Sequence, residues 1–164
     1  MNKTQKPVIC VVGKSKVGKT SFLEKLILEL KQRHYRVGTI KHYHGEFEID
    51  RPGKDTWRHA YAGADAVVIS TPKKAALIKK LDQELPVDQI IPLLGEVDLV
   101  LAEGYKKEDY AQIEVCHPDI TKLPSSNKLL VRVYCIPQNG SKPAFRTEDI
   151  QKIANLIEEK FLLS

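Results

Sequence analysis

The stretch Gly13-Lys14-Ser15-Lys16-Val17-Gly18-Lys19-Thr20 matches the pattern G-x-x-x-x-G-K-[ST], which is the phosphate-binding P-loop. Its glycines allow backbone conformations that other residues rarely adopt, so that successive N–H groups can point inward at an anion. The Lys19 ammonium would contact the β- and γ-phosphates, and the Thr20 hydroxyl would coordinate Mg²⁺. The positive end of the following helix would add to the attraction. We therefore expect these eight residues, and Ser21 after them, to bind a nucleoside triphosphate.

The residues on both sides of this stretch fit the strand–loop–helix order that a P-loop requires. Before it, Pro7-Val8-Ile9-Cys10-Val11-Val12 is a continuous apolar run, typical of a strand that is buried on both faces. A coincidental pair of glycines at a strand-to-helix turn is the alternative, and the flanking patterns disfavour it. After the loop, apolar residues recur at helical spacing at Phe22, Leu23, Leu26, Ile27 and Leu30.

Strand and helix patterns alternate along the rest of the chain, which indicates an α/β fold. We predict a mainly parallel sheet with helices on both faces, as in three-layer P-loop nucleoside triphosphatases. The length of 164 residues suits one core, so we expect residues 1–164 to form a single nucleotide-binding domain. We predict strands at 7–12, 36–41, 66–70, 73–78, 98–103, 113–116 and 129–133, and helices at 19–34, 54–62, 86–94 and from 147 onward.

Composition and charge exclude several classes of partner. The longest apolar runs have the length of a strand, so we predict no transmembrane helix and no membrane partner. The first residues, 1–6, lack the apolar core of a secretory signal, which favours a cytoplasmic location. The net charge is +5, but Lys and Arg are spread along the chain without an RNA-binding signature, so direct nucleic-acid binding is disfavoured.

The three cysteines are not arranged as a redox or zinc motif. Cys10 and Cys135 lie inside apolar runs and are interpreted as buried small hydrophobic residues. Cys116-His117 could form half of a metal site, but the chain has no second half at ligand spacing.

A nucleoside triphosphate site also needs a carboxylate for the Mg²⁺ shell. In open α/β sheets, ligands bind at the carboxyl ends of the strands. Asp98 opens the strand 98–103 and lies at the wrong end, whereas Glu103 closes it. Glu103 is therefore the predicted metal carboxylate, and an ordinary loop glutamate is the alternative. Gly104 would let a backbone N–H approach the γ-phosphate.

The segment after the strand 36–41 is dense in polar side chains and leaves the sheet at the same end. Lys41 could contact phosphate, and Asp50 could join the metal shell or orient the attacking water. Asp55 could bind the ligand or cap the helix 54–62. His42 and His44 could ligate a metal or face phosphate, and their roles stay open. The candidate catalytic residues are thus Lys19, Asp50 and Glu103, and the candidate metal ligands are Thr20, Asp50 and Glu103.

The identity of the base is poorly encoded. Common GTPases read guanine with an Asn/Thr-Lys-x-Asp motif that follows a strand, but Asn127-Lys128-Leu129-Leu130 lacks the Asp and precedes its strand. No cluster of arginines marks the lid of a small-molecule kinase. The residues by themselves therefore leave guanine and adenine open.

Several blocks, taken together, resemble the molybdopterin-guanine dinucleotide biosynthesis protein B (MobB) family. They are the P-loop, the I-K-H-Y-H run at 40–44, the D-R-P-G-K-D-T run at 50–56, Ala62-Gly63-Ala64, and the A-E-G-Y-K run at 102–106. The resemblance covers roughly residues 7–110. It implies a protein that binds GTP with Mg²⁺, hydrolyses GTP slowly, and assists the nucleotidyltransferase (MobA) that attaches GMP to molybdopterin.

The same resemblance implies a homodimer and makes molybdopterin itself a candidate ligand. By it, Lys41, Asp50, Asp55 and Glu103 become expected site residues. Lys14 stands where related P-loop ATPases and GTPases carry a lysine that reaches across a dimer interface, but the family's own loop varies there, so the role of Lys14 stays open.

Three other functions remain as alternatives. The first is a P-loop kinase of a small metabolite, with Asp50 as the base. The second is a GTP-dependent metal-delivery chaperone that uses His42, His44 and Cys116-His117. The third is an adaptor whose P-loop only anchors a stabilising nucleotide without turnover.

Overall fold

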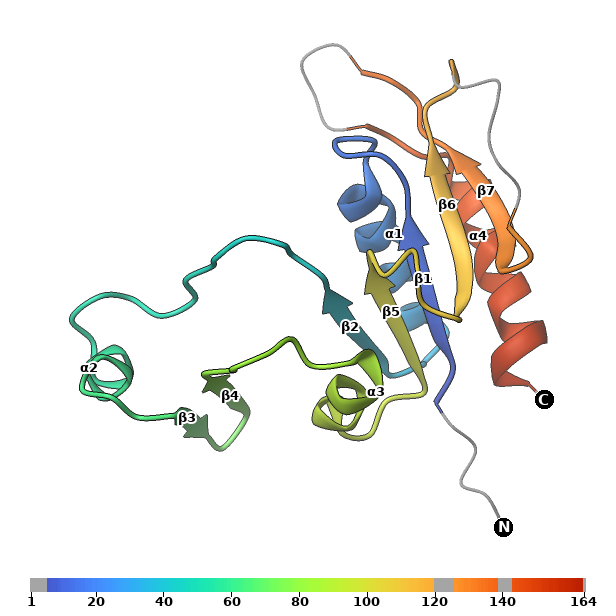
Figure 1. Ribbon diagram of the computed structural model, residues 1–164. Coiled ribbons are helices and arrows are strands. Elements are labelled where there is room, and N and C mark those ends of the chain that lie inside the picture. Colours follow the sequence, from blue (N-terminus) through green and yellow to red (C-terminus); the bar gives the residue numbers. More distant parts are fainter. Residues whose placement is uncertain (1–5, 120–125, 139–142, 164) are drawn as a thin grey trace. The chain divides into compact units, whose positions relative to one another are not determined.

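The computed structural model describes residues 6–119, 126–138 and 143–163 (Figure 1). The chain divides into two compact units, which are Met1–Tyr43 with Ile91–Ser164, and His44–Ile90. Each unit has its own sheet, of five strands in the first and two in the second. A single nucleotide-binding domain over residues 1–164 stays a prediction, because compact units need not fold as separate domains. Residues 1–5, on which much of the argument about a secretory signal rests, lie outside the described residues.

The first unit is built on a five-stranded parallel sheet, as predicted. Its strands, in spatial order, are β2 (Val37–Lys41), β5 (Leu99–Glu103), β1 (Val8–Val12), β6 (Ala111–Cys116) and β7 (Leu129–Tyr134). All five residues of the central strand β1 are buried. This explains why its sequence is a continuous apolar run rather than an alternating one.

Two helices, α1 (Lys19–Gln32) and α4 (Thr147–Ile157), cover one face of this sheet (Figure 1). A π-helical turn, η2 (Glu158–Leu162), continues α4. The Phe22 and Phe145 rings pack edge to face, with ring centroids 5.5 Å apart. Each large apolar side chain buried here stabilises the fold by about 1.5–3 kcal/mol. The core between helices and sheet includes Ile9, Val11, Leu99, Leu101, Ile113, Val115, Phe22, Leu26, Leu30, Ile153 and Ile157.

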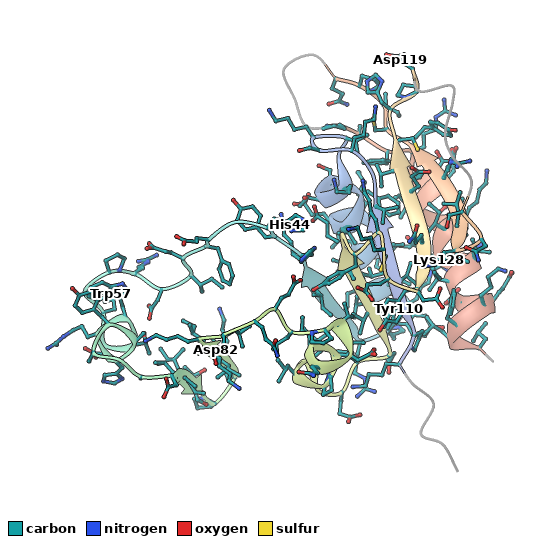
Figure 2. All side chains as sticks on the ribbon, in the orientation of Figure 1. His44, Trp57, Asp82, Tyr110, Asp119 and Lys128 are labelled. Atoms are coloured by element: carbon teal, nitrogen blue, oxygen red, sulfur yellow. The ribbon has the colours of Figure 1, made fainter. Side chains whose placement is uncertain are left out.

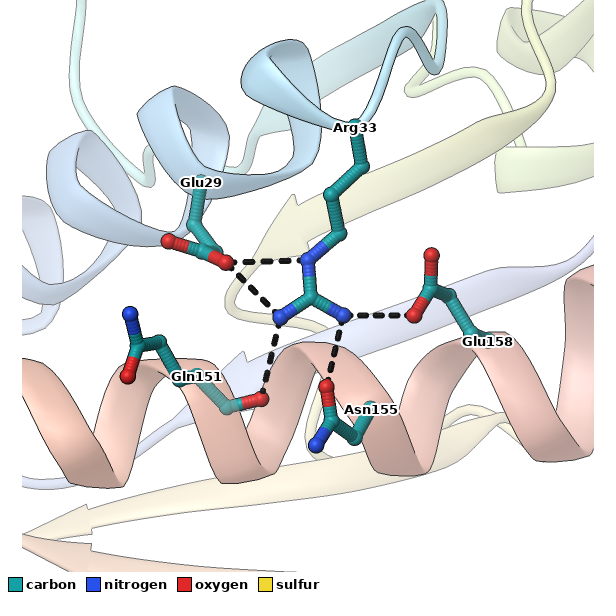
Figure 3. Close-up of polar contacts among 5 residues, drawn as sticks. All are labelled: Glu29, Arg33, Gln151, Asn155 and Glu158. Carbon is teal, nitrogen blue, oxygen red and sulfur yellow. Dashed lines mark hydrogen bonds and ion pairs between the residues drawn. The ribbon is translucent and has the colours of Figure 1, made fainter.

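Arg33, at the C-terminal end of α1, ties α1 to α4 (Figure 3). Its guanidinium donates to Glu29 Oε1 from Nε (2.9 Å) and from Nη2 (2.7 Å). Its Nη1 donates to Asn155 Oδ1 (2.7 Å) and to the Glu158 carboxylate. The Arg33 side chain is only 20% exposed, so these bonds fix the relative position of the two helices more firmly than a surface ion pair would.

The other face of the five-stranded sheet is covered by different elements. Because β1 lies between β5 and β6, the connection 104–110 crosses over β1 to reach β6 (Figure 1). Gln112 Nε2 donates to the Lys106 carbonyl (3.1 Å) and holds this crossing loop on the sheet. Beneath it Cys10 is fully buried, and burial raises the pKa of its thiol to about 11. A short 3₁₀ helix, η1 (Ile91–Leu94), packs on β2, where a Cβ at Gly38 would lie 2.9 Å from Leu94 Cδ1.

The second unit contains α2 (Asp55–Tyr61), the antiparallel hairpin of β3 (Ala66–Thr71) and β4 (Lys74–Lys79), and α3 (Val87–Ile90). The rings of Trp57, which is labelled in Figure 2, and Tyr61 stack on each other along α2, with centroids 4.8 Å apart. The two predicted strands of this region form, but as a hairpin in a separate sheet. The single helix predicted over 86–94 is wrong, because α3 ends at Ile90 and η1 follows, with Pro92 unable to donate an α-helical hydrogen bond.

Candidate phosphate-binding site

The loop between β1 and α1 has the backbone geometry of an anion-binding nest. Gly13, Lys16 and Gly18 all have positive φ (148°, 62° and 99°). A Cβ at Gly13 would lie 2.4 Å from the Val115 carbonyl oxygen, so only glycine fits there. Gly18 is the N-cap of α1 and brings no side chain to the first N–H groups of the helix. Those N–H groups are therefore available to a phosphate.

Lys19 folds back over this loop. Its Nζ donates to the carbonyl oxygens of Lys14 (2.9 Å) and Gly13 (3.3 Å), which holds the ammonium above the nest. Burial lowers the pKa of Lys19, the nearby charges of Lys106 and Lys41 lower it too, and Glu103 opposes them. A bound phosphate would favour the charged form, so the positive charge here is balanced best when an anion is present.

Glu103, at the carboxyl end of β5, contacts the first turn of α1. Its Oε2 accepts a hydrogen bond from Thr20 Oγ1 (3.3 Å), and the Lys41 ammonium lies 3.9 Å from the same oxygen. Lys41 and Glu103 are register partners at the ends of β2 and β5, and Glu103 also pairs with Val11 at the end of β1. The Glu103 side chain is 14% exposed. In P-loop sites Mg²⁺ is coordinated by a threonine hydroxyl, one carboxylate, phosphate oxygens and water.

Gly104 and His42 close the edge of the site next to Glu103. The Gly104 N–H donates to the Val11 carbonyl (3.1 Å), so a contact of this N–H with a γ-phosphate would have to replace that bond. Gly104 has φ 108°, and a Cβ there would lie 3.1 Å from His42 Cβ. The His42 ring stacks on Tyr105, with centroids 4.6 Å apart. Sequence reasoning did not predict this packing of Gly104 against His42, and the only signal was the position of Gly104 after a strand.

The structure thus brings together Thr20, Lys19, Lys41 and Glu103. Asp50 and Asp55 belong to the second unit, and their part in a phosphate site stays a prediction. The suggestion that Asp55 caps its helix is wrong by one position: Lys54 is the N-cap, and Asp55 lies in the first turn, where its charge complements the helix dipole.

Lys106 is a residue that the sequence reasoning did not assign to the site. The positive charge of Lys106 contributes to lowering the pKa of Lys19, so we interpret the crossing loop 104–110 as a source of a further cation near the P-loop. The only signal was its place in the A-E-G-Y-K block.

The metal alternatives find no support in the described part of the chain. No group of three or more His, Cys, Asp or Glu side chains there could hold a metal ion. His117 Nδ1 instead lies 3.2 Å from Asp119 Oδ2. Cys116 is buried, and that burial raises the pKa of its thiol. Within the same described ranges, no helix is both long and apolar enough to cross a membrane.

Comparison with known proteins identifies the family of this chain. The model of the family "Molybdopterin guanine dinucleotide synthesis protein B" (MobB) matches residues 8–135. The chain is similar to the molybdopterin-guanine dinucleotide biosynthesis adapter protein of Haemophilus influenzae, with 34% identity over 158 residues that cover 94% of this chain and 89% of the relative. The adapter protein of the same description from Escherichia coli is 35% identical over 165 residues, which cover 96% and 94% of the two chains.

Solved structures show the same fold. A crystal structure of molybdopterin-guanine biosynthesis protein B superposes with a TM-score of 0.66 at 27% identity, covering 93% of this chain and 97% of that one. A crystal structure of Bacillus subtilis MobB superposes with a TM-score of 0.70 at 24% identity, covering 94% and 98%. The α/β class with a mainly parallel sheet is therefore confirmed.

Proposed function

Because the chain belongs to the MobB family, we propose that it is a GTP-binding adapter that assists the attachment of GMP to molybdopterin. The two relatives are described as molybdopterin-guanine dinucleotide biosynthesis adapter proteins, which supports this role. The observation that carries the nucleotide part of the proposal is the contact of Thr20 Oγ1 with Glu103 Oε2, beside an ammonium held above the loop.

In this proposal the loop 13–18 and the first turn of α1, with Ser21, surround the phosphates. Lys19 contacts the β- and γ-phosphates, while Lys41 and Lys106 lower the cost of concentrating negative charge there. Mg²⁺ would take the Thr20 hydroxyl and the Glu103 carboxylate, exchanging their mutual hydrogen bond for two metal bonds. The metal would neutralise charge that develops on the phosphates during hydrolysis.

We propose that hydrolysis is slow and serves to change state rather than to turn over substrate. A glutamine could position the attacking water, but the buried Gln112 donates to the Lys106 carbonyl. In this structure its side chain therefore holds the crossing loop instead. Rapid GTPases add a water-positioning glutamine and an arginine finger, and a partner protein can supply the latter. The MobA-like guanylyltransferase is the partner that we propose, with cytoplasmic residence for both.

A homodimer is part of the proposal. Val68 and Leu77 face each other across the β3–β4 hairpin and are 61% and 51% exposed. A two-stranded hairpin is marginally stable by itself, and an exposed apolar pair on it favours burial against another chain. We propose that this face, defined by Val68 and Leu77, packs in the dimer.

The nucleotide proposal is tested by calorimetric titration of the purified protein with GTP and with ATP, each with Mg²⁺. We expect GTP to bind at least about tenfold more tightly than ATP, a difference of about 1.4 kcal/mol. Lys19→Ala should abolish tight triphosphate binding. Lys25→Ala, on the exposed face of the same helix, is the matched control and should bind as the unaltered protein does. Micromolar GTP affinity retained by Lys19→Ala would contradict the phosphate assignment.

A further inference from the structure

Three lysines and one glutamate gather around the carboxyl ends of β2 and β5, beside the phosphate loop. The Lys41 ammonium lies 3.9 Å from Glu103 Oε2, and Thr20 Oγ1 donates to the same oxygen (3.3 Å). The positive charges of Lys106 and Lys41 both contribute to lowering the pKa of Lys19. Cations therefore outnumber the carboxylate by three to one in this group, and the surplus positive charge attracts an anion.

Lys41 is held less firmly than Lys19. The carbonyl oxygens of Lys14 and Gly13 both accept hydrogen bonds from Lys19 Nζ. Within the part of the chain that the structure describes, the Lys41 ammonium has only Glu103 as a partner, and their 3.9 Å separation is too long for a hydrogen bond. The Lys41 side chain is 62% exposed, so this ion pair is weak. An anion that offers a closer contact can therefore take Lys41 away from Glu103.

The strand register places Lys41 on the far side of Glu103 from the phosphate loop. Glu103 pairs with Lys41 on β2 and with Val11 on β1, the strand that leads into the loop 13–18. The strand β5 lies between the other two (Figure 1). In P-loop sites the backbone nest surrounds the α- and β-phosphates, and the metal ion lies between the β- and γ-phosphates. Because Glu103 is the proposed metal carboxylate, Lys41 lies on the side of the γ-phosphate rather than of the α-phosphate.

An exchange of partners would keep the charge of Lys41 balanced. When the Glu103 carboxylate serves a metal ion, as the proposed function requires, it no longer balances the nearby ammonium. The oxygens of a γ-phosphate are negatively charged and accept charge-assisted hydrogen bonds from an ammonium group. A nucleoside diphosphate lacks this group, so it offers Lys41 nothing in exchange for Glu103.

We propose that Lys41 is the residue by which this site distinguishes a nucleoside triphosphate from a nucleoside diphosphate. Its ammonium exchanges the Glu103 carboxylate for an oxygen of the γ-phosphate, and only the triphosphate provides that oxygen. The inference rests on the proposed nucleotide site and deepens it, because it assigns the discrimination to one side chain outside the P-loop. It does not depend on the base, so ATP and ADP should be distinguished in the same way as GTP and GDP.

The test is a calorimetric titration of the full-length protein with GTP and with GDP, each with Mg²⁺. We expect the unaltered protein to bind GTP at least about tenfold more tightly than GDP. Lys41→Gln removes a charge-assisted hydrogen bond that only the triphosphate makes, so GTP should bind about tenfold more weakly and the affinity for GDP should change by less than about twofold. Lys25→Gln, on the exposed face of α1, removes an equal charge and should leave both affinities unchanged.

Two further variants separate the possible failures. Lys41→Arg keeps the positive charge and should retain most of the preference for GTP. Lys19→Ala should lose both nucleotides, because Lys19 is expected to contact the β-phosphate as well.

An unchanged ratio of GTP to GDP affinity in Lys41→Gln, or an equal loss of both nucleotides, would overturn the role of Lys41. If Lys19→Ala still loses both nucleotides, the phosphate site itself stands. Failure of the unaltered protein to bind any triphosphate would overturn the phosphate site and the role of Lys41 together. The ratio of ATP to ADP affinity should fall by the same factor in Lys41→Gln, which tests Lys41 even where the guanine preference fails.

Discussion

The two units of this chain differ in how far each covers its own apolar surface. In the first unit every residue of β1 is buried, and α1 and α4 close one face of the sheet. In the second unit β3 has one buried residue, Val67, and the side chains of Val68, Ile69 and Leu77 are more than half exposed (61%, 53% and 51%). The first unit buries its apolar side chains within its own core, whereas the second leaves large apolar side chains exposed on its hairpin.

The largest effect is expected in the core of the first unit. Phe22→Ala removes a fully buried ring that packs against Phe145. We expect the free energy of unfolding to fall by about 3–5 kcal/mol, from lost transfer energy and the cavity left behind. Urea denaturation followed by circular dichroism measures it. A loss below about 1 kcal/mol would show that the first unit is not held by this core.

A glycine in each unit gives the next comparison. Gly13→Ala places a Cβ 2.4 Å from the Val115 carbonyl oxygen at φ 148°, so the loop must distort. Gly63→Ala has φ 112° but nothing within 4 Å of the new Cβ. We expect Gly13→Ala to lose GTP binding and about 2–4 kcal/mol of stability, and Gly63→Ala to lose about 1–2 kcal/mol from backbone strain alone. Equal losses of stability in thermal unfolding would refute the steric explanation.

The Arg33 hydrogen bonds that tie α1 to α4 should contribute less to the free energy of unfolding than the buried Phe22 ring does. Arg33→Ala removes hydrogen bonds to Glu29, Asn155 and Glu158 in a partly exposed setting. We expect a loss of about 1–2 kcal/mol in chemical denaturation. Arg58→Ala, in α2 of the second unit, is the comparison variant and should change stability by less than about 0.5 kcal/mol.

The Asp98–Arg36 pair gives the first unit a modest dependence on acid. Hydrogen bonds from the Arg36 side chain and backbone lower the pKa of Asp98 in the folded state. A carboxyl group with a lowered folded pKa stabilises the fold above its unfolded pKa, and this contribution is lost as pH falls through the lower folded value. Unfolding titrations from neutral pH to below pH ~4 should therefore show a shallower loss of stability in Asp98→Asn. Identical slopes in both proteins would exclude a contribution from this pair.

The smallest change in stability is expected on the hairpin of the second unit. Leu77→Ser replaces a half-exposed side chain, so the unfolding of one chain should change by less than about 0.5 kcal/mol. Light scattering should nevertheless show a shift from dimer toward monomer if this face packs between copies. An unchanged dimer would place the interface elsewhere.

The part of the site that the sequence predicted is the part that local patterns encode. The P-loop spacing and the end of the strand at Glu103 selected Thr20 and Glu103, and the end of the neighbouring strand selected Lys41. The structure brings these three side chains together. The approach of Lys106 and the stacking of His42 on Tyr105 were not foreseen, because both depend on how the loop 104–110 crosses the sheet. The prediction of one helix over 86–94 was wrong. It was based on the helical tendency of the whole segment, but Pro92 cannot donate an α-helical hydrogen bond, and the chain changes to a 3₁₀ helix there.

By itself the sequence determined the α/β class, the position of the glycine-rich loop at 13–18 and the presence of a carboxylate at the carboxyl end of the strand that closes at Glu103. These follow from interactions between near neighbours along the chain, which periodicity and glycine spacing record. Only the tertiary structure decided the strand order β2-β5-β1-β6-β7, the separate antiparallel hairpin, and a cavity in the second unit. Strand neighbours and cavities arise from contacts between residues far apart in the chain, and those contacts leave no local pattern to read.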